Sequence, residues 1–440
     1  MLDRPRIGLL FDYDWDKLAH ARLEEAHDFE RHGFDLFSFP ENLRLIGFDL
    51  ENFAKSLARR ARRQSWSGVI SHHEHFGALA AALVAEKAGL PGTSPEAILA
   101  CQHKGYARRV LGEVAPDATL SFATARPGGE IDSGKEPPFP AFVKPIKGVF
   151  SVLARAVKTR SDFELHTRFT GRERWVLNRL ITPFERVLQR RLPGAGSSLG
   201  WVIEEPVPAA RQFNLDGFVI GGHLEVLGFV DARIDAVTGA FTAFETPSRT
   251  SPEVRSRAER ILARFLRAIG FEHGSVNAEF FYDPITDRLT VIEINPRLAS
   301  QFGDLYRRVY GVDPHAMALA LAQGANPFEV PRSKPESRVA ASIVFRTSRL
   351  LPAPHAPTPR QVADLERALP GSLLLAFSRS RRSRERDLAW TGTSRYGVLH
   401  IGAGNGAELH EKATRAAGIL GWTLPSGAQP LREHVLEQST

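Results

Sequence analysis

Two carboxylates and an amide stand close together in a segment whose composition predicts a β-hairpin. Residues 275–297 are rich in aromatic and β-branched residues on both sides of a turn-forming stretch, 283–287. With this turn at the centre, Glu279 lies opposite Glu293, and Asn295 shares the face of Glu293. Two facing carboxylates repel each other, and a divalent cation between them removes that repulsion. Oxygen ligands of this kind suit Mg²⁺, which commonly holds substrate phosphates.

The alternative for this segment is an exposed hairpin with both carboxylates in water. Its flanking residues argue against exposure, because they are apolar: Phe280, Phe281, Val291, Ile292 and Ile294. A buried charge without a partner is costly. The sequence therefore favours a metal–nucleotide site with Glu279, Glu293 and Asn295 as ligands.

Length and composition predict a soluble globular protein of two or three domains. The chain has 440 residues, of which 43% are hydrophobic and 24% charged. We find no apolar run long enough to span a bilayer and no signal peptide at the start. Cys101 is the only cysteine, which excludes an intramolecular disulfide framework and a cysteine zinc cluster. These features predict a cytoplasmic protein.

The charge balance is basic, with 57 Lys+Arg against 50 Asp+Glu and a net charge of +7. Nearly all of the positive charge is arginine, and an arginine bias of this kind also arises from genome composition. Nucleic-acid binding is therefore the less favoured interpretation. The surplus suits an anionic substrate such as ATP.

Strands alternate with helices in the first part of the chain, which predicts a parallel α/β domain. We expect strands at 6–11, 35–39 and 68–71, and helices at 17–32 (capped by Gly33), 53–64 and 77–88 (ended by Gly89). Proline and glycine near residue 95 predict the end of this domain.

The remaining chain predicts a larger central domain and a small α/β unit. The expected elements are a helix at 96–111, a strand-rich region at 119–160, a helical region at 161–191, strands at 201–205 and 216–228, and helices at 252–269 and 311–323. Further strands are expected near 340–345, 373–377 and 397–401, with a helix at 407–420. The predicted domains are 1–95, 96–330 and 331–440.

The order of the motifs resembles the ATP-grasp superfamily, in its carboxylate–amine ligase and biotin-carboxylase-like branch. The motifs are Lys104 on a helix, Val143-Lys144-Pro145 before a turn, Glu204-Glu205 at a strand end, and Glu279 with Glu293-Ile294-Asn295-Pro296-Arg297. The layout covers the whole chain, and the specific motifs lie between about residues 90 and 310. The resemblance implies an α/β (α+β ATP-grasp) fold, in which residues 119–203 form a mobile lid.

The resemblance also implies roles for single residues. The residues expected to contact the phosphates are Lys104, Lys144, Lys147 and Ser151. The segment expected to hold the adenine contains Glu204, Glu205 and Val207. Gln212 is expected near the ribose. Glu279, Glu293 and Asn295 match ligands of Mg²⁺ or Mn²⁺. Arg297 matches an arginine that stabilises phosphate, so Arg297 and Lys144 are the expected catalytic residues.

The implied reaction uses ATP to activate a carboxylate as an acyl phosphate, which an amine then attacks to give an amide, ADP and phosphate. The implied partners are a small carboxylate and a small amine, and many relatives are homodimers. Two departures keep alternatives open. The lid turn 146–151 has one glycine, which leaves a non-catalytic ATP-binding module as an alternative. A biotin-carboxylase-like or carboxylate–thiol ligase ranks lower, because the neutral Gln301 stands where bicarbonate activation needs a base.

Other motifs have simpler interpretations. The histidine-rich segment Ser71–His75 follows a strand, and its spacing fits no common helical metal-ligand pair, although its loop could face a substrate. Residues 194–200 lack the strand and helix of a dinucleotide fingerprint. The basic run 379–386 is typical of a solvated face. The sequence does not distinguish whether His273 is a site residue or an ordinary polar residue.

Overall fold

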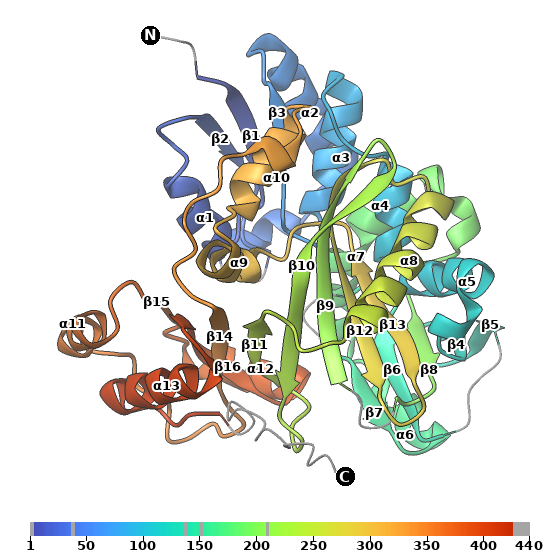
Figure 1. Ribbon diagram of the computed structural model, residues 1–440. Helices are drawn as coiled ribbons and strands as arrows, with labels where there is room; N and C mark the ends of the chain where they lie inside the picture. Colours follow the sequence, from blue (N-terminus) through green and yellow to red (C-terminus); the bar gives the residue numbers. More distant parts are fainter. Residues whose placement is uncertain (1–3, 37–39, 135–138, 149–152, 208–210, 426–440) are drawn as a thin grey trace, which may run out of the picture. The chain divides into compact units, whose positions relative to one another are not determined.

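The computed structural model describes residues 4–36, 40–134, 139–148, 153–207 and 211–425 (Figure 1). The chain forms two compact units. The first comprises residues 1–229, 250–303 and 313–331, and the second comprises 230–249, 304–312 and 332–440. We describe each unit separately. The three-domain division expected from the sequence stays a prediction.

Unit one begins with a three-stranded parallel sheet in the order β2-β1-β3. The strands are β1 (Arg6–Leu10), β2 (Asp28–His32) and β3 (Gly68–Ile70), and the helices are α1 (Asp14–Ala21), α2 (Leu50–Arg63) and α3 (Gly77–Ala88). The predicted parallel α/β start of the chain is confirmed. Gly89 ends α3 in the left-handed conformation, with φ +74°.

The predicted helix 17–32 is wrong beyond Ala21. Residues 28–32 form β2, in which Phe29 pairs with Ile7 of β1. Pairing with a buried strand overrides the local helical pattern, because it satisfies the backbone of β2 and covers the sheet edge. Gly33 follows this strand instead of capping a helix. The predicted strand 35–39 lies partly outside the described residues, and its described part, 35–36, is not in a strand.

The predicted helix 96–111 is two helices, α4 (Pro95–Gln102) and α5 (Lys104–Val114). His103 breaks the chain direction between them, with φ −94° and ψ 94°. Its ring Nδ1 accepts a hydrogen bond of 3.0 Å from the Tyr106 backbone N–H and so caps α5. The break places Lys104 at the first residue of a helix.

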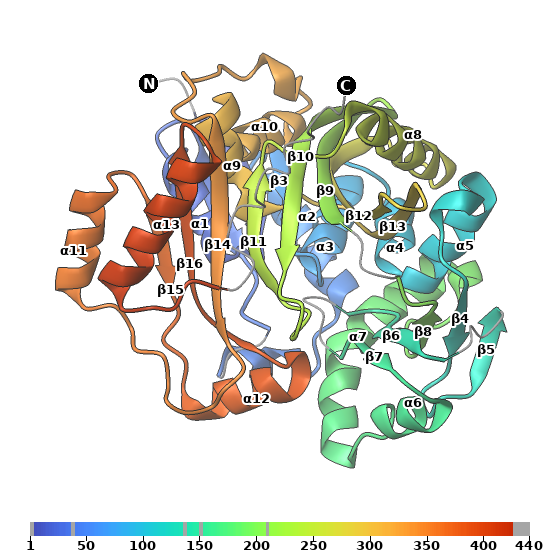
Figure 2. The same cartoon turned by 60° about the horizontal axis from the view of Figure 1, so that its bottom comes forward.

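A five-stranded antiparallel sheet follows in unit one, in the order β5-β4-β8-β6-β7. Its strands are β4 (Phe122–Ala125), β5 (Ile131–Gly134), β6 (Ala141–Pro145), β7 (Arg155–Val157) and β8 (Trp201–Glu204). The helices α6 (Arg160–His166) and α7 (Gly171–Arg191) lie beside it (Figure 2). This is the predicted strand-rich region followed by a helical one.

The predicted hairpin is present as β12 (His273–Asp283) and β13 (Arg288–Asn295), and Glu279 pairs with Glu293. Before it, β9 (Arg211–Ile220) pairs with β12, and β10 (His223–Ile234) continues into unit two. Alternate residues of β9, β12 and β13 are polar on one face: Gln212, Asn214, Asp216, Asn277, Glu279, Glu293 and Asn295. The other face is apolar and packs with helix α8 (Pro252–Ala268) in the main core (Figure 1).

Helix α10 (Pro314–Ala322) lies beside the parallel sheet in unit one. Its Leu319 packs with Ile7 and Leu9 of β1. A Cβ on Gly68 of β3 would lie 2.7 Å from the Ala322 carbonyl oxygen, so only glycine permits this approach. The sequence predicted α10 but not helix α9 (Gly303–Tyr310), which precedes it.

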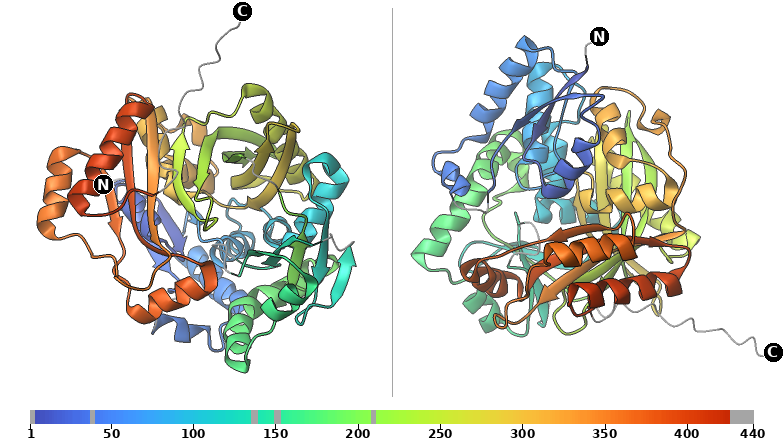
Figure 3. Two further views of the ribbon diagram at one scale, coloured as in Figure 1. Left: turned by 90° about the horizontal axis from the view of Figure 1, so that it is seen from below. Right: turned by 90° about the vertical axis from the view of Figure 1, so that its left-hand side faces the viewer.

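Unit two is an antiparallel sheet in the order β10-β11-β14-β16-β15. Its strands after β10 are β11 (Phe241–Thr246), β14 (Val339–Thr347), β15 (Leu373–Ala376) and β16 (Ser394–Ala403). The helices α11 (Pro359–Ala368) and α13 (Gly406–Leu420) pack on this sheet, and Figure 3 shows them on one face. The basic run 379–386 lies at helix α12 (Arg381–Thr391), none of whose residues is buried. No helix in the described part of the chain combines the length and the apolar character that crossing a membrane requires.

Candidate functional site

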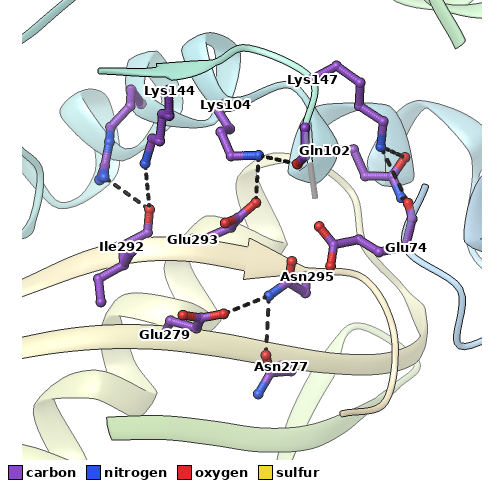
Figure 4. Close-up of polar contacts among 12 residues, drawn as sticks. Glu74, Gln102, Lys104, Lys144, Lys147, Asn277, Glu279, Ile292, Glu293 and Asn295 are labelled. Carbon is purple, nitrogen blue, oxygen red and sulfur yellow. Dashed lines mark hydrogen bonds and ion pairs between the residues drawn. The ribbon is translucent and has the colours of Figure 1, made fainter. Parts of the chain in front are cut away.

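The facing carboxylates of the hairpin are the centre of the candidate site (Figure 4). Burial, and after it the nearby Glu293 carboxylate, raise the pKa of Glu279 to about 7. Gln212 donates to Glu279 Oε2 at 3.1 Å. A cation beside Glu279 would stabilise its ionised form and lower the carboxyl pKa.

Lys104 supplies one cation to Glu293. Its Nζ lies 2.8 Å from Glu293 Oε1 and also donates to the Gly148 carbonyl at 2.7 Å. Burial opposes the charge on Lys104, but Glu293 and Glu74 outweigh it and raise the lysine pKa. Burial likewise opposes the charge on Glu293, but Lys104 and Lys144 outweigh it and lower the carboxyl pKa. Both groups are therefore charged at neutral pH.

Lys144 and Arg108 share the buried Glu204 carboxylate. Lys144 Nζ lies 3.0 Å from Glu204 Oε2, and Arg108 Nε lies 2.7 Å from Oε1. Arg108 also donates to the carbonyls of Val291, at 2.5 Å, and Ile292, at 3.0 Å. Arg108 therefore joins α5 to both β8 and β13. Burial lowers the pKa of Lys144, and Glu204 partly offsets that.

Lys147 is the third lysine of the site and is only 2% exposed. Its Nζ donates to Gln102 Oε1 at 3.1 Å and to the Glu74 carbonyl at 3.3 Å, and it lies 4.6 Å from the centre of the Phe184 ring. Burial lowers its pKa to about 7. Ser151, also predicted at the phosphates, lies outside the described residues.

Arg297 forms an ion pair of 2.6 Å with Glu74 Oε2, and Glu74 comes from the histidine-rich segment. Burial opposes the charge on Arg297, but Glu74 outweighs it and raises the guanidinium pKa. Asn295 lies between Glu74 and Glu279. Its amide nitrogen is 3.4 Å from Glu279 Oε1 in one orientation and 3.1 and 3.2 Å from the Glu74 oxygens in the other. The second orientation turns the amide oxygen toward Glu279, as a metal ligand requires.

The residues predicted at the nucleobase are only partly together. The Glu204 carboxylate already forms ion pairs with Arg108 and Lys144. Glu205 Oε1 lies 2.5 Å from Arg288 Nη2. Val207 lies after the end of β8 and is half-exposed. Gln212 lies at Glu279, on the polar face of the sheet. Their roles stay predictions. His273 bonds the Leu321 carbonyl of α10 at 2.8 Å.

Sequence reasoning missed four polar residues of this site: Glu74, Gln102, Arg108 and Asn277. Two of them carry a signal in the sequence. Arg108 stands four residues after Lys104 on one helix, and Asn277 stands two residues before Glu279 on one strand, so each shares the face of a predicted residue. Gln102 and Glu74 are brought in by the fold alone.

The donors present fit Mg²⁺ or Mn²⁺. Two carboxylates and an amide oxygen converge from paired strands, and burial together with the Glu293 carboxylate disfavours the ionised form of Glu279. A bound divalent cation would offset both effects.

Comparisons with known proteins agree with this architecture. No model of a known protein family matches the chain. Carnosine synthase 1 of Gallus gallus is 28% identical over 272 residues, which are 59% of this chain but only 27% of that protein. The chain thus spans far less than two thirds of this relative.

Solved structures match almost the whole chain. L-amino acid ligase from Bacillus licheniformis superposes with a TM-score of 0.65 at 15% identity, over 95% of this chain and 98% of that one. The chain has the ATP-grasp fold. A second ATP-grasp structure is the biotin carboxylase domain of Hydrogenobacter thermophilus 2-oxoglutarate carboxylase, in complex with MgADP, ADP and bicarbonate. It has a TM-score of 0.59 at 13% identity, over 94% of this chain and 90% of that one.

Proposed function

We propose that this ATP-grasp chain is an ATP- and Mg²⁺-dependent enzyme that joins a small carboxylate to an amine and releases ADP and phosphate. The observation that carries the proposal is the pairing of Glu279 with Glu293 beside the buried cations Lys104 and Lys144. The likeness to an amino-acid ligase and to carnosine synthase supports an amide-forming reaction.

The nucleotide lies between the lid and the polar face of the hairpin sheet in this proposal. Lys104, Lys144 and Lys147 contact the phosphates, with Ser151 of the lid turn. A phosphate beside Lys147 restores its charge, because a nearby anion raises the pKa that burial has lowered. The chain after β8, Glu204 to Val207, holds the adenine largely through backbone groups, and Gln212 positions Glu279.

Glu279, Glu293 and Asn295 hold the metal ion. When bound, Mg²⁺ neutralises the charge on the β- and γ-phosphates. Lys104 keeps Glu293 ionised and oriented at 2.8 Å, so this ligand is ready before the metal arrives.

The chemical step is attack of a substrate carboxylate oxygen on the γ-phosphorus, which breaks the bond to ADP and forms an acyl phosphate. The amine then attacks the acyl carbon and displaces phosphate. Arg297, held by Glu74, stabilises the negative charge on the transferred phosphoryl group. Closure of the lid, residues 119–203, excludes water that would hydrolyse the acyl phosphate.

The test is ADP release from ATP and Mg²⁺ with separate pools of amino acids, small carboxylates and bicarbonate. We expect release only with carboxylate and amine together, and its loss in Glu293→Gln. Glu272→Gln is the matched control, because this exposed glutamate precedes the same hairpin. Release with bicarbonate alone would move the assignment to a carboxylase. ATP binding without turnover on any pool would leave an ATP-binding module.

A further inference from the structure

A second cluster of ligand-type side chains lies in unit one, outside the candidate nucleotide site. Asp16 on α1, His72 after β3 and His315 on α10 place their ligand atoms within 4.8 Å of one another. His315 Nε2 lies 3.3 Å from Asp16 Oδ1. The three residues are 0%, 3% and 2% exposed. Three segments far apart in the sequence therefore meet at one buried point.

In the described part of the chain, no lysine or arginine forms an ion pair with Asp16. Among the described residues, the only ion pair of Asp16 is the one with His315. The second oxygen of Asp16, Oδ2, accepts a hydrogen bond of 3.0 Å from the Tyr13 backbone N–H, which is a neutral donor. A buried carboxylate without a strong cation is costly.

The His72 side chain has the properties of a metal ligand. Both of its ring nitrogens are buried without a hydrogen-bond partner among the described residues. In a neutral imidazole, one ring nitrogen carries a lone pair that a metal ion can accept. A buried polar atom left unpaired costs free energy that a metal bond would recover.

A second layer of polar groups stands behind the cluster. The ring of His20 lies 5.7 Å from the His315 ring and 6.2 Å from the His72 ring. Its Nδ1 lies 3.9 Å from Asp12 Oδ2.

The His315 ring packs directly against the backbone of Gly303. A Cβ at Gly303 would lie 2.8 Å from His315 Cε1 and 2.9 Å from Nδ1. Any other residue there would displace the ring, so the position of His315 depends on bare backbone.

We propose that Asp16, His72 and His315 bind a divalent transition-metal ion of the zinc class. Two imidazoles and one carboxylate are ligands that Zn²⁺ takes, and three protein ligands leave a fourth position for water or a substrate group. Ligand atoms in a tetrahedral zinc site are about 3.3 Å apart. Asp16 Oδ1 and His315 Nε2 already have that separation, and the ligand atoms of the three residues all lie within 4.8 Å of one another. This site does not depend on the proposed ligase activity.

A second buried histidine–aspartate pair, in unit two, serves as the matched control. His400 Nδ1 lies 3.3 Å from Asp304 Oδ2, the same separation as in the Asp16 pair. Asp304, however, also pairs with Arg308 at 2.6 Å and Arg307 at 2.9 Å. Its negative charge is already balanced, so no metal is needed there.

The experiment is a Zn²⁺ titration of the EDTA-treated full chain against a chromogenic chelator. We expect one tightly bound zinc per chain, and an affinity at least about 100-fold weaker in His72→Ala and His315→Ala. His400→Ala and Glu279→Gln should bind zinc as the unchanged protein does, which excludes the unit-two pair and the hairpin carboxylates as the site. Equal affinity in all variants, or no tightly bound zinc, would overturn the proposal.

A measurement on the unchanged protein covers the case in which a histidine variant fails to fold. Zinc-edge X-ray absorption of the loaded chain should show nitrogen and oxygen neighbours with the scattering pattern of two imidazoles. A spectrum with oxygen neighbours alone would place the zinc on carboxylates and contradict the proposed site.

Discussion

The hairpin carboxylates and the Asp16 cluster lie in the same compact unit, yet different side chains surround them. Glu293 has Lys104 at 2.8 Å, and Glu204 has Arg108 at 2.7 Å and Lys144 at 3.0 Å. Among the described residues, Asp16 forms its ion pair with the His315 imidazole, and its other carboxylate oxygen accepts a hydrogen bond from the Tyr13 backbone N–H. The comparison teaches that the kind of neighbour decides which ion a buried carboxylate recruits. Oxygen ligands among lysines suit a magnesium–phosphate complex, and imidazole ligands suit a transition metal.

The largest expected effect separates the two sites by function. Glu293→Gln removes a proposed ligand of the nucleotide-bound metal, so we expect ADP release to fall at least about a thousandfold. Zinc binding should not change, because Glu293 is absent from the Asp16 cluster. Steady-state ADP release and the zinc titration, made on the same preparation, check both expectations. A parallel loss of zinc would show that the two sites are one.

Arg108→Met tests how strongly the hairpin site depends on cations from the protein. Lys144 remains, but Glu204 loses its closest partner, and two carbonyls of β13 lose their donor. We expect the free energy of unfolding to fall by about 3–5 kcal/mol in urea denaturation. Arg109→Met is the control, since the hydrogen bonds of this neighbour to described residues go to the carbonyls of Gly194 and Ala195, and it stacks on Tyr106. Equal losses in the two variants would contradict the role given to Arg108.

The pKa of Glu279 predicts how the stability of the metal-free protein depends on pH. The folded protein holds the Glu279 proton up to about pH 7, whereas the unfolded chain releases it near the ordinary value of 4.5. The folded state therefore binds more protons in this window, and stability falls as pH rises through it. Relative to Glu279→Gln, we expect a loss of up to about 3 kcal/mol between pH 4.5 and 7.

The free energy of unfolding of the unchanged protein and of Glu279→Gln is measured by denaturation at several pH values, with and without Mg²⁺. Mg²⁺ should remove the loss, because it binds the ionised carboxylate. A difference between the two proteins that does not change with pH would show that Glu279 has an ordinary pKa.

The smallest effect concerns the place of His315. Gly303→Ala puts a methyl group against the ring and forces it away from its present position, at a cost of about 0.5–1.5 kcal/mol. We expect zinc affinity to fall roughly 2–10-fold. Gly418→Ala is the matched control, since nothing lies within 4 Å of a Cβ at that helical glycine. Unchanged affinity in Gly303→Ala would show that the His315 ring adapts freely.

Most of the hairpin site follows from local rules. The period of two along a strand is enough to place Glu279 opposite Glu293 and Asn295 on the same face, and the register confirms it. The same rule applied to β12 and the helical repeat applied to α5 would have added Asn277 and Arg108. Glu74 and Gln102 follow from no such rule, because they reach Arg297 and Lys147 only through packing of separate elements.

The errors in secondary structure have one physical cause. The segment 17–32 has a helical pattern, yet its last residues pair with β1. The segment 96–111 also has one, yet His103 ends the first helix and caps the second. In both cases, contacts with distant or neighbouring elements outweighed a weak local preference.

The sequence by itself determined the ATP-grasp fold and the facing carboxylates, because both depend on motif order and on a hairpin closed within residues 273–295. Only the tertiary structure decided the Asp16 cluster. Asp16 and His315 are 299 residues apart, and no periodicity relates them. They meet because α10 packs against the N-terminal sheet, where bare backbone at Gly68 lets the end of the helix approach. The histidine-rich segment contributes one residue to this cluster, His72. The other two residues of the cluster, Asp16 and His315, come from distant parts of the chain.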